Sequence, residues 1–392
     1  WGGNQLSYLK RWESNTIDSR QLPEGIPSCA GGGGCQLDKV YIELQGVRNA
    51  AHLAIAMLVA YDKVDSPALR GQMYALVGYS ELLLADLYCS GVPLSTLNLH
   101  GGFTYRAGST TEEVYQAAVA QFDTAMALSG DSAHILNLAR VGKGRAFLAL
   151  AKYDSAAAAV DSVPPAFSYQ FPVQWAVTNN LGGVAGGVFG QFLYDQVNLG
   201  GVTEADTQGT NGLLYLSSGD PRTVGDMWGS NIHGIPQYAP RKYGGAALQT
   251  SASLVLPITV ADGIEASLIR AEAAYHNVAT GSGSWLDQLN ALRRTISLSD
   301  LSDPGIGNSN PDSARVALLF QERAYWLYLT GHRQGDLRRL IRNYGWSPDA
   351  VYPTGSYPLF GSFQYYGNDV TAPIPIDEHK NPLFTGCLSR GA

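Results

Sequence analysis

Apolar residues recur at the spacing of an α-helix over long parts of this chain. Between residues 40 and 163 this spacing predicts a series of helices, many of them rich in alanine. They are expected at residues 40–58, 67–88, 111–128, 135–151 and 153–160. Ser66-Pro67 is a helix start signal, as is Thr110 or Thr111 followed by Glu113. Consecutive helices can therefore pack as antiparallel hairpins.

The regular pattern fails between residues 164 and 260, where Gly, Pro, Asn and aromatic residues dominate. Short strands are predicted at residues 187–194 and 253–258. An ordered irregular stretch of this length is more often functional than accidental, so it is the candidate ligand region. Helical spacing returns at residues 264–277 and 285–295.

Residues 312–344 read as two further helices. Asp312 or Ser313 can N-cap the first, which is apolar on nearly every side and should be buried. Gly331 can take the left-handed conformation that ends this helix, and the second helix is expected at residues 336–342.

Two charged residues, Glu322 and Arg323, lie inside the first of these helices. An unpaired charge in a buried segment is expensive, so both need partners. Arg333 and Asp336, across the turn, are the nearest candidates. We interpret the four residues as a buried ion-pair network that fixes how two helices dock, rather than as groups that carry out chemistry.

The predicted fold class is all-α, with tetratricopeptide-like helical hairpins, long irregular loops and a few short strands. We expect a single domain over residues 1–392. Its segments are an irregular N-terminus (1–36), a helical-hairpin scaffold (40–163), the loop-rich candidate ligand region (164–260), C-terminal helical pairs (261–343) and an aromatic, Pro-rich tail (344–392).

Composition narrows the function classes. Hydrophobic residues make up 45% of the chain and charged residues 15%, and the formal net charge is -7. Nucleic acid is therefore not expected as a partner, because such binding depends on basic surface that neutralises phosphates. No apolar run approaches the length of a membrane span. We expect a soluble globular protein.

The cysteines are even in number. Cys29 and Cys35 bracket a glycine loop that can close a small disulfide ring, whereas a zinc site would need more ligands nearby. The even count permits Cys89–Cys387 as a second bridge. Both bridges imply an oxidising compartment. The chain starts at Trp1, which suggests a processed mature protein.

Several segments in a fixed order carry a family resemblance. The most specific are Glu322-Arg323, Gly331-His332-Arg333 and Asp336-Leu337. The others are LRGQMYA (69–75), LYCSGVPL (87–94), TEEVY (111–115), GDPR (219–222), IRAEA (269–273), LNALR (289–293), PIP (373–375) and Asn381-Pro382. In this order and spacing, the chain resembles the SusD/RagB family, the surface-exposed nutrient-binding partners of TonB-dependent outer-membrane transporters.

The resemblance implies a helical scaffold whose irregular loops shape a ligand surface, and it implies no catalysis. The implied partner is a SusC-like TonB-dependent transporter, and the implied ligand is an oligosaccharide or a peptide. It also implies a lipid anchor at the outer-membrane surface, although no Cys stands at position 1 here. No nucleophile elbow, phosphate loop or zinc signature is present in the sequence.

Sugar binding commonly uses aromatic faces that stack on pyranose rings, flanked by amide groups. The irregular segments supply aromatic residues and amides, and the alternative is that these aromatics pack loops onto the scaffold. Our first choices for ligand contact are Trp228, Tyr238 and Trp346, followed by Trp175 and Asn231.

Two further kinds of site are open. The loop with Asp300, Asp303, Asn308, Asn310 and Asp312 could chelate calcium, but it lacks ordered ligand spacing and a solvated turn is the competing interpretation. No other metal or cofactor is expected. Asp-Ser/Thr followed by a small apolar residue recurs and resembles a bacterial O-glycosylation signal, although helix caps look the same. The candidate hydroxyls are Thr124, Ser132, Ser155, Ser162 and Ser313.

The sequence therefore predicts a non-enzymatic, exported binding protein that captures an oligosaccharide or peptide and delivers it to a TonB-dependent transporter. The alternative is a structural subunit of a glycosylated surface lattice or extracellular filament built on the same fold. Low charge, together with 45 Gly and 22 Tyr, favours this alternative and makes self-association possible.

Overall fold

The fold was analysed in a computed structural model of the chain. The structure describes residues 20–22, 36–61, 66–175, 212–215, 217–230, 236–244, 254–279, 281, 283–357 and 364–392. The chain divides into two compact units. The helical unit comprises Pro23–Tyr169, Ala261–Leu319 and Thr371–Ala392, and the loop-rich unit comprises Trp1–Leu22, Gln170–Val260 and Phe320–Val370. The predicted single domain and its segments stay a prediction.

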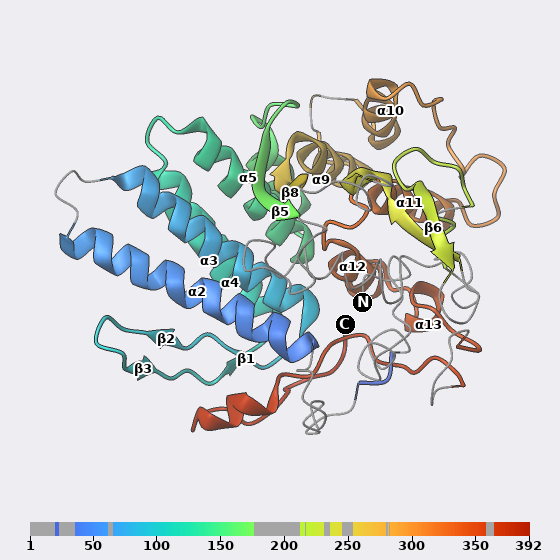
Figure 1. The fold of residues 1–392 in the computed structure, drawn as a ribbon. Coiled ribbons are helices and arrows are strands. Elements are labelled where there is room, and N and C mark those ends of the chain that lie inside the picture. Colours follow the sequence, from blue (N-terminus) through green and yellow to red (C-terminus); the bar gives the residue numbers. More distant parts are fainter. Residues whose placement is uncertain are drawn as a thin grey trace. The chain divides into compact units, whose positions relative to one another are not determined.

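The helical unit is built from consecutive helices that pack against one another. Its helices are α2 (Gln36–Tyr61), α3 (Pro67–Leu87), α4 (Thr111–Leu128), α5 (Ala133–Ala149), α6 (Tyr153–Val160), α9 (Gly263–Tyr275) and α10 (Trp285–Thr295). Each of the first five packs on the next, α6 packs on α9, and α9 packs on α10. Figure 1 shows α2, α3 and α4 side by side. The predicted all-α class and its stacked helical hairpins are confirmed.

Local signals start these helices where the sequence predicted. Pro67 occupies the first turn of α3. Thr110, rather than Thr111, is the N-cap of α4 and forms a reciprocal capping box with Glu113. Ser132 caps α5 through the amide of Ile135.

Glycines let the helices of this unit approach closely. A Cβ placed on Gly78 of α3 would lie 2.8 Å from the Phe122 ring of α4, and one placed on Gly71 would lie 3.0 Å from a backbone oxygen of Ala125. Phe122 is fully buried and meets Tyr79 edge to face, with ring centroids 5.1 Å apart. The small residues noted in the sequence therefore lie at the helix contacts.

Short strands and a disulfide complete the helical unit. β1 (Val92–Pro93) pairs with β4 (Gly108–Ser109), and β2 (Thr96–Leu97) pairs with β3 (Phe103–Thr104), both antiparallel. The predicted Cys89–Cys387 disulfide is present. Beside it, the Ser90 amide donates to the Ser389 carbonyl and the Leu388 amide donates to the Ser90 carbonyl. Cys29 and Cys35 lie outside the described residues.

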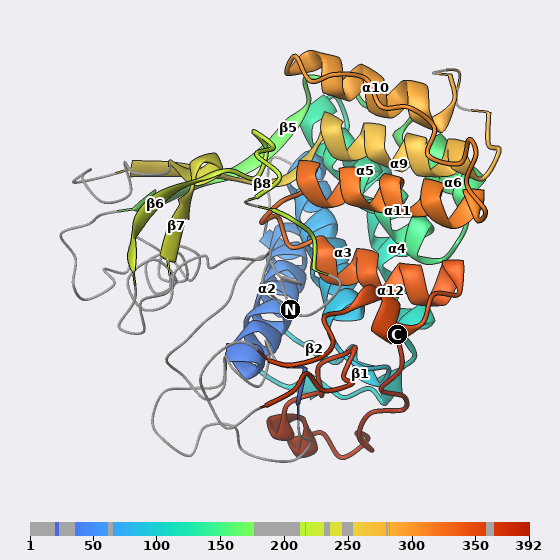
Figure 2. The same cartoon turned by 90° about the vertical axis from the view of Figure 1, so that its right-hand side faces the viewer.

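Among its described residues, the loop-rich unit contains two small sheets, the C-terminal part of one helix and a second helix that follows it. β5 (Ser168–Trp175) pairs with β8 (Leu254–Asp262), and β6 (Gly225–Ser230) pairs with β7 (Pro236–Pro240). Figure 2 shows β6 and β7 as one hairpin. The strand predicted at residues 253–258 is found as β8, and the one predicted at 187–194 lies outside the described residues. The remaining elements are η3 (Arg241–Tyr243), α12 (Arg333–Tyr344), α13 (Pro348–Val351) and, in the helical unit, η4 (Ile376–Lys380).

Helix α11 (Pro311–Trp326), whose residues from Phe320 onward belong to the loop-rich unit, begins earlier than predicted. The predicted N-cap at Asp312 or Ser313 is wrong, because the side chain of Asn310 accepts the Ser313 amide at 3.4 Å. Pro311 then stands in the first turn, where its missing N–H is not needed. Gly331 and Gly345 both have positive φ, 79° and 70°, and Gly345 is the C-cap of α12. No helix among the described residues is long and apolar enough to cross a membrane.

Candidate functional site

The β6–β7 hairpin carries two of the predicted aromatic contacts. Its register pairs Met227 with Tyr238 and Gly229 with Gln237. Trp228 is therefore the extra residue of a β-bulge, a feature that bends a strand and alters where its side chains point. The side chains of Trp228 and Tyr238 lie outside the described residues, so the structure establishes their backbone positions alone.

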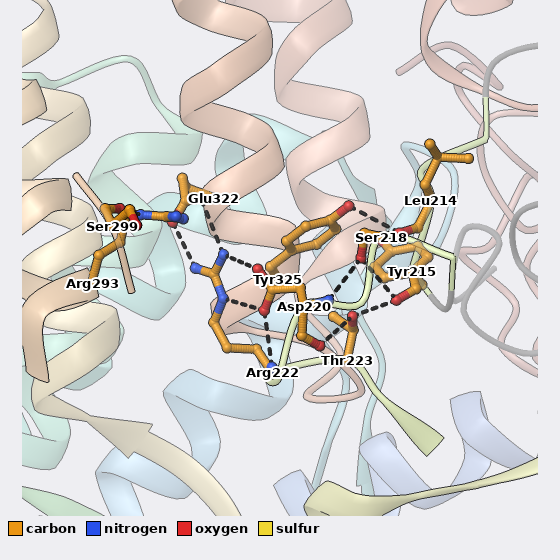
Figure 3. A network of polar contacts seen from close by, with 10 residues as sticks. All are labelled: Leu214, Tyr215, Ser218, Asp220, Arg222, Thr223, Arg293, Ser299, Glu322 and Tyr325. Atoms are coloured by element: carbon orange, nitrogen blue, oxygen red, sulfur yellow. Dashed lines mark hydrogen bonds and ion pairs between the residues drawn. The ribbon is translucent and has the colours of Figure 1, made fainter. Parts of the chain in front are cut away.

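The loop that leads into this hairpin is held by a buried arginine. The Arg222 guanidinium donates from Nη1 and Nη2 to the two carboxylate oxygens of Glu322, at 2.6 and 3.1 Å. It also donates from Nε and Nη2 to both oxygens of Asp220, at 2.8 and 2.6 Å. Only 5% of the Arg222 side chain and 3% of the Glu322 side chain is exposed. Figure 3 shows this guanidinium between its two carboxylates.

Two opposing effects act on the pKa of Arg222. Burial lowers it, but the hydrogen bonds that the guanidinium donates to Asp220 and Glu322, together with the negative charges of these two residues, raise the pKa by more, so the net shift is upward. The guanidinium also lies over two rings of α11, with Cζ 4.9 Å from the Trp326 centroid and 5.3 Å from the Tyr325 centroid. Arg222 is therefore a permanent cation that ties the loop to α11. We name Asp220, Arg222 and Glu322 the arginine clamp.

Neutral hydrogen bonds extend the arginine clamp. The Tyr325 hydroxyl donates to the Leu214 carbonyl at 3.1 Å, and the Thr223 hydroxyl donates to the Tyr215 carbonyl. Tyr215 itself is buried, with its ring centroid 5.2 Å from that of Tyr328. The loop before β6 is thus held both by its own turn and by α11 (Figure 3).

The chain that leaves the β6–β7 hairpin is anchored on residues 328 and 329, which follow α11. After β7, the 3-10 helix η3 places Lys242 so that its Nζ donates to the Tyr328 carbonyl at 2.6 Å. The Tyr243 hydroxyl donates to the Leu329 carbonyl at 2.7 Å, and burial raises the pKa of this phenol. Both ends of the β6–β7 hairpin therefore rest on residues 322–329, which makes the hairpin a rigidly mounted element.

The predicted ion-pair network is partly confirmed and partly wrong. Arg323 and Asp336 form the expected pair, with bonds of 3.0 and 2.9 Å, and Arg339 joins Asp336 at 2.8 Å. Burial would raise the pKa of Asp336, but the two arginines outweigh it and lower the value. Glu322, however, pairs with Arg222 rather than with Arg333, which is half-buried. Helical geometry places Glu322 and Arg323 on different faces, so they meet different partners.

The other predicted contacts are dispersed. Trp346 is half-buried directly after Gly345, and its amide donates to the Leu340 carbonyl in the closing turn of α12. Trp175 ends β5, but its side chain lies outside the described residues, as does the whole of Asn231. Their assignment to one ligand surface stays a prediction.

In the candidate calcium loop, arginine side chains bind the aspartate carboxylates. Asp303 receives two nitrogens of Arg315 and the Gly305 amide, and these hydrogen bonds lower its pKa. Asp300 pairs with Arg294, and Asp312 lies 3.6 Å from Arg315. No cluster of three or more His, Cys, Asp or Glu side chains fit for a metal was found among the described residues. A solvated turn stays the favoured interpretation of this loop, and calcium binding stays the alternative.

The candidate glycosylation hydroxyls lie at helix ends or on helix surfaces. Ser132 accepts the Ile135 amide as an N-cap, and Thr124 donates to the Ala120 carbonyl. Ser162 is exposed, whereas Ser155 and Ser313 are partly exposed. Their modification stays a prediction.

Solved structures show what this arrangement of elements is. A carbohydrate-binding SusD-like protein from Bacteroides vulgatus matches with a TM-score of 0.63 over 97% of this chain and 89% of its own, at 15% identity. The chain has the SusD-like fold. A laminarin-binding SusD-like protein matches with a TM-score of 0.61 and 16% identity, over 99% of this chain and 92% of its own. Surface glycan-binding protein A from Bacteroides uniformis matches with a TM-score of 0.61 and 14% identity, over 98% of this chain and 91% of its own.

No family model and no curated protein matches the sequence. At these identities the likeness establishes the SusD-like fold and nothing finer. The residue that sequence reasoning missed is Arg222. Its signal was present, since Asp220-Pro221-Arg222 is part of the GDPR segment that carried the family resemblance. Nothing local to that segment, however, indicates that it pairs with Glu322.

Proposed function

We propose that this protein is a non-enzymatic glycan-binding protein of the SusD/RagB type. The observation that carries the proposal is the β6–β7 hairpin, whose strands contain Trp228 and Tyr238 and whose two ends are anchored on residues 322–329. Aromatic contacts on a rigid mount lose little conformational entropy when a ligand binds. Solved structures of this fold that are described as carbohydrate-binding support the choice of an oligosaccharide over a peptide.

The proposed mechanism is capture followed by transfer. The ring faces of Trp228, Tyr238 and Trp346 stack on sugar rings, and amide groups such as that of Asn231 bond hydroxyl groups. Trp175 contributes a further ring. The protein then acts as a lid over a SusC-like TonB-dependent transporter, from a lipid-anchored position on the outer-membrane surface. The ordered loops supply selectivity, and the helical unit supplies the scaffold.

Binding assays with matched variants test this proposal. We expect the glycans that bind the wild type on a glycan array to bind the combined Trp228→Ala and Tyr238→Ala variant at least roughly tenfold more weakly, a difference of about 1.4 kcal/mol or more. Tyr61→Ala removes an exposed ring from α2 in the helical unit and should leave the affinity unchanged. Absence of any glycan or peptide binder at millimolar concentration, with no transporter co-purifying, would refute capture.

A structural role is the second candidate, favoured by the low charge and the many Gly and Tyr residues. A subunit of a glycosylated surface lattice or filament would polymerise after purification. Negative-stain microscopy of the purified protein separates the two, because a capture protein should appear as single particles.

A further inference from the structure

A second hairpin, in the helical unit, has the construction of a ligand-contact element. The β2–β3 hairpin spans residues 96–104, with Thr96 opposite Thr104 and Leu97 opposite Phe103 (Figure 1). Its turn is fixed by Asn98, whose side-chain oxygen accepts the amides of His100 and Gly102 at 2.9 and 3.0 Å. The turn is therefore locked by its own sequence.

The base of this hairpin is clamped by helix α2. Arg48 donates to the Ser95 carbonyl at 2.6 Å and to the Leu94 carbonyl at 2.8 Å, while its Nε bonds Glu81 at 2.9 Å. Both Arg48 and Glu81 are buried. Asn49 accepts the Leu97 amide at 3.2 Å. These are strong, charge-assisted contacts that leave the hairpin little freedom to move.

The strand that leaves the hairpin is also held. Asn381, buried near the chain's C-terminal end, donates to the Arg106 carbonyl at 2.8 Å, and the Arg106 amide donates to the Ser95 hydroxyl at 3.0 Å. Both limbs of the β2–β3 hairpin are thus fixed, as both ends of the β6–β7 hairpin are.

Two aromatic rings on this rigid mount remain open to solvent. Phe103 is 54% exposed and Tyr105 is 40% exposed. Their ring planes differ by only 18°, and their centroids are 5.9 Å apart. The two rings lie next to each other, and neighbouring exposed apolar side chains can form a binding surface, whereas exposed hydrophobic residues that are scattered singly need no such explanation. Nearly parallel, open rings offer flat apolar faces with partial negative charge.

We propose that Phe103 and Tyr105 form a sugar-stacking surface on the β2–β3 hairpin, which contacts a neutral hexose unit of a glycan. The C–H bonds on one face of a pyranose carry partial positive charge and match the ring faces. Residues 93–110 contain no carboxylate and one cation, Arg106, so charge recognition is not the main interaction there. The inference rests on the proposed glycan-binding function and adds a surface in the helical unit.

Affinity electrophoresis in gels that contain laminarin, amylopectin or polygalacturonate tests the inference. These probes present a neutral β-glucan, a neutral α-glucan and an acidic glycan. We expect the wild type to be retarded by a neutral glucan, and the combined Phe103→Ala and Tyr105→Ala variant to bind it at least roughly fivefold more weakly, about 1 kcal/mol. Tyr105→Phe keeps the ring and should bind like the wild type.

Leu99→Ala is the matched control, since Leu99 lies in the same hairpin and is 43% exposed but has no ring. It should keep wild-type affinity, and melting curves should show every variant folded. Wild-type glucan binding by the double variant would overturn the inference while the Trp228 and Tyr238 variants still test the proposed function. Retardation by polygalacturonate alone would overturn the neutral-sugar assignment. Loss of a co-purifying membrane protein with unchanged glycan affinity would identify a protein-docking face instead, and no binding by the wild type would refute both proposals.

Discussion

The helical unit and the loop-rich unit differ in how the hydrogen-bonding groups of their backbones find partners. In the helical unit, helices such as α3, α4 and α5 bond their own carbonyls internally, so their contacts can be made by small and apolar side chains. In the loop-rich unit, irregular carbonyls need donors from elsewhere. Lys242 and Tyr243 provide two of them, and Gln334 provides another to Val370.

This difference explains where the charges lie. An arginine offers five donors in a planar fork, so one buried side chain can bind carboxylates and brace an irregular segment at the same time. Arg20 illustrates this in the loop-rich unit, because it donates to the carbonyls of Asp369 and Pro353. The helical unit uses the same device with Arg48, which holds the start of the β2–β3 hairpin. Arg20, Arg48 and Arg222 therefore hold irregular chain, whereas the buried Arg323 joins α11 to α12 through Asp336.

The arginine clamp is the strongest test of this comparison. Arg222→Ala removes the guanidinium that pairs with the carboxylates of Glu322 and Asp220 in a buried site, and we expect a loss of roughly 3–5 kcal/mol in the free energy of unfolding. Urea unfolding measures it. Arg333→Ala is the control, because Arg333 was the partner predicted from the sequence. It should lower the free energy of unfolding by less than about 1 kcal/mol. Equal effects of the two variants would contradict the assignment.

Removal of the Cys89–Cys387 bridge should weaken the helical unit. The bridge closes a loop between residues 298 positions apart, and loss of a native disulfide typically costs roughly 2–5 kcal/mol. The double Cys→Ser variant should unfold at a lower temperature in scanning calorimetry. The wild type under reducing conditions should approach the variant's melting temperature; if it stayed well above it, the serines rather than the missing bridge would be responsible.

Close helix packing predicts a smaller effect at Gly78. An alanine there would place its Cβ 2.8 Å from the Phe122 ring, and overpacking of this kind costs roughly 1–3 kcal/mol. Gly46→Ala in α2 is the matched control, because nothing lies within 4 Å of its added Cβ. It should stabilise the protein by about 0.5–1 kcal/mol through helix propensity. A stabilising Gly78→Ala would show that the helices adjust freely.

The smallest expected effect is a pH dependence in the helical unit. Burial and the nearby Arg48 charge lower the pKa of His52 to about 4, whereas an unfolded histidine titrates near about 6.5. Between these values the unfolded chain binds more protons, so His52 stabilises the fold fully above pH 6.5 and less as the pH falls toward 4. Urea titrations of wild type and His52→Leu should therefore converge or cross as the pH falls over that window; a constant difference would exclude this role.

Much of the fold could be predicted from the sequence because helices are short-range structures. The α10 boundaries at Trp285 and Thr295 and the capping box of Thr110 with Glu113 depend on residues within four positions of one another. The Cys89–Cys387 bridge could be predicted for another reason, since the even cysteine count left few pairings. The candidate site was less accessible: Trp228 was chosen by residue type, and its place in a bulge depends on strand register.

The sequence by itself therefore determined the helical pattern, the helix caps and the presence of charges that had to be paired. The tertiary structure alone decided the partners. Glu322 binds Arg222, 100 residues away, rather than Arg333 across the turn, and Arg48 of a predicted helix holds the base of a hairpin that the sequence did not reveal. The physical reason is range. Helix signals act within one turn of chain, whereas a buried charge is neutralised by whichever group the completed fold brings within 3 Å or so.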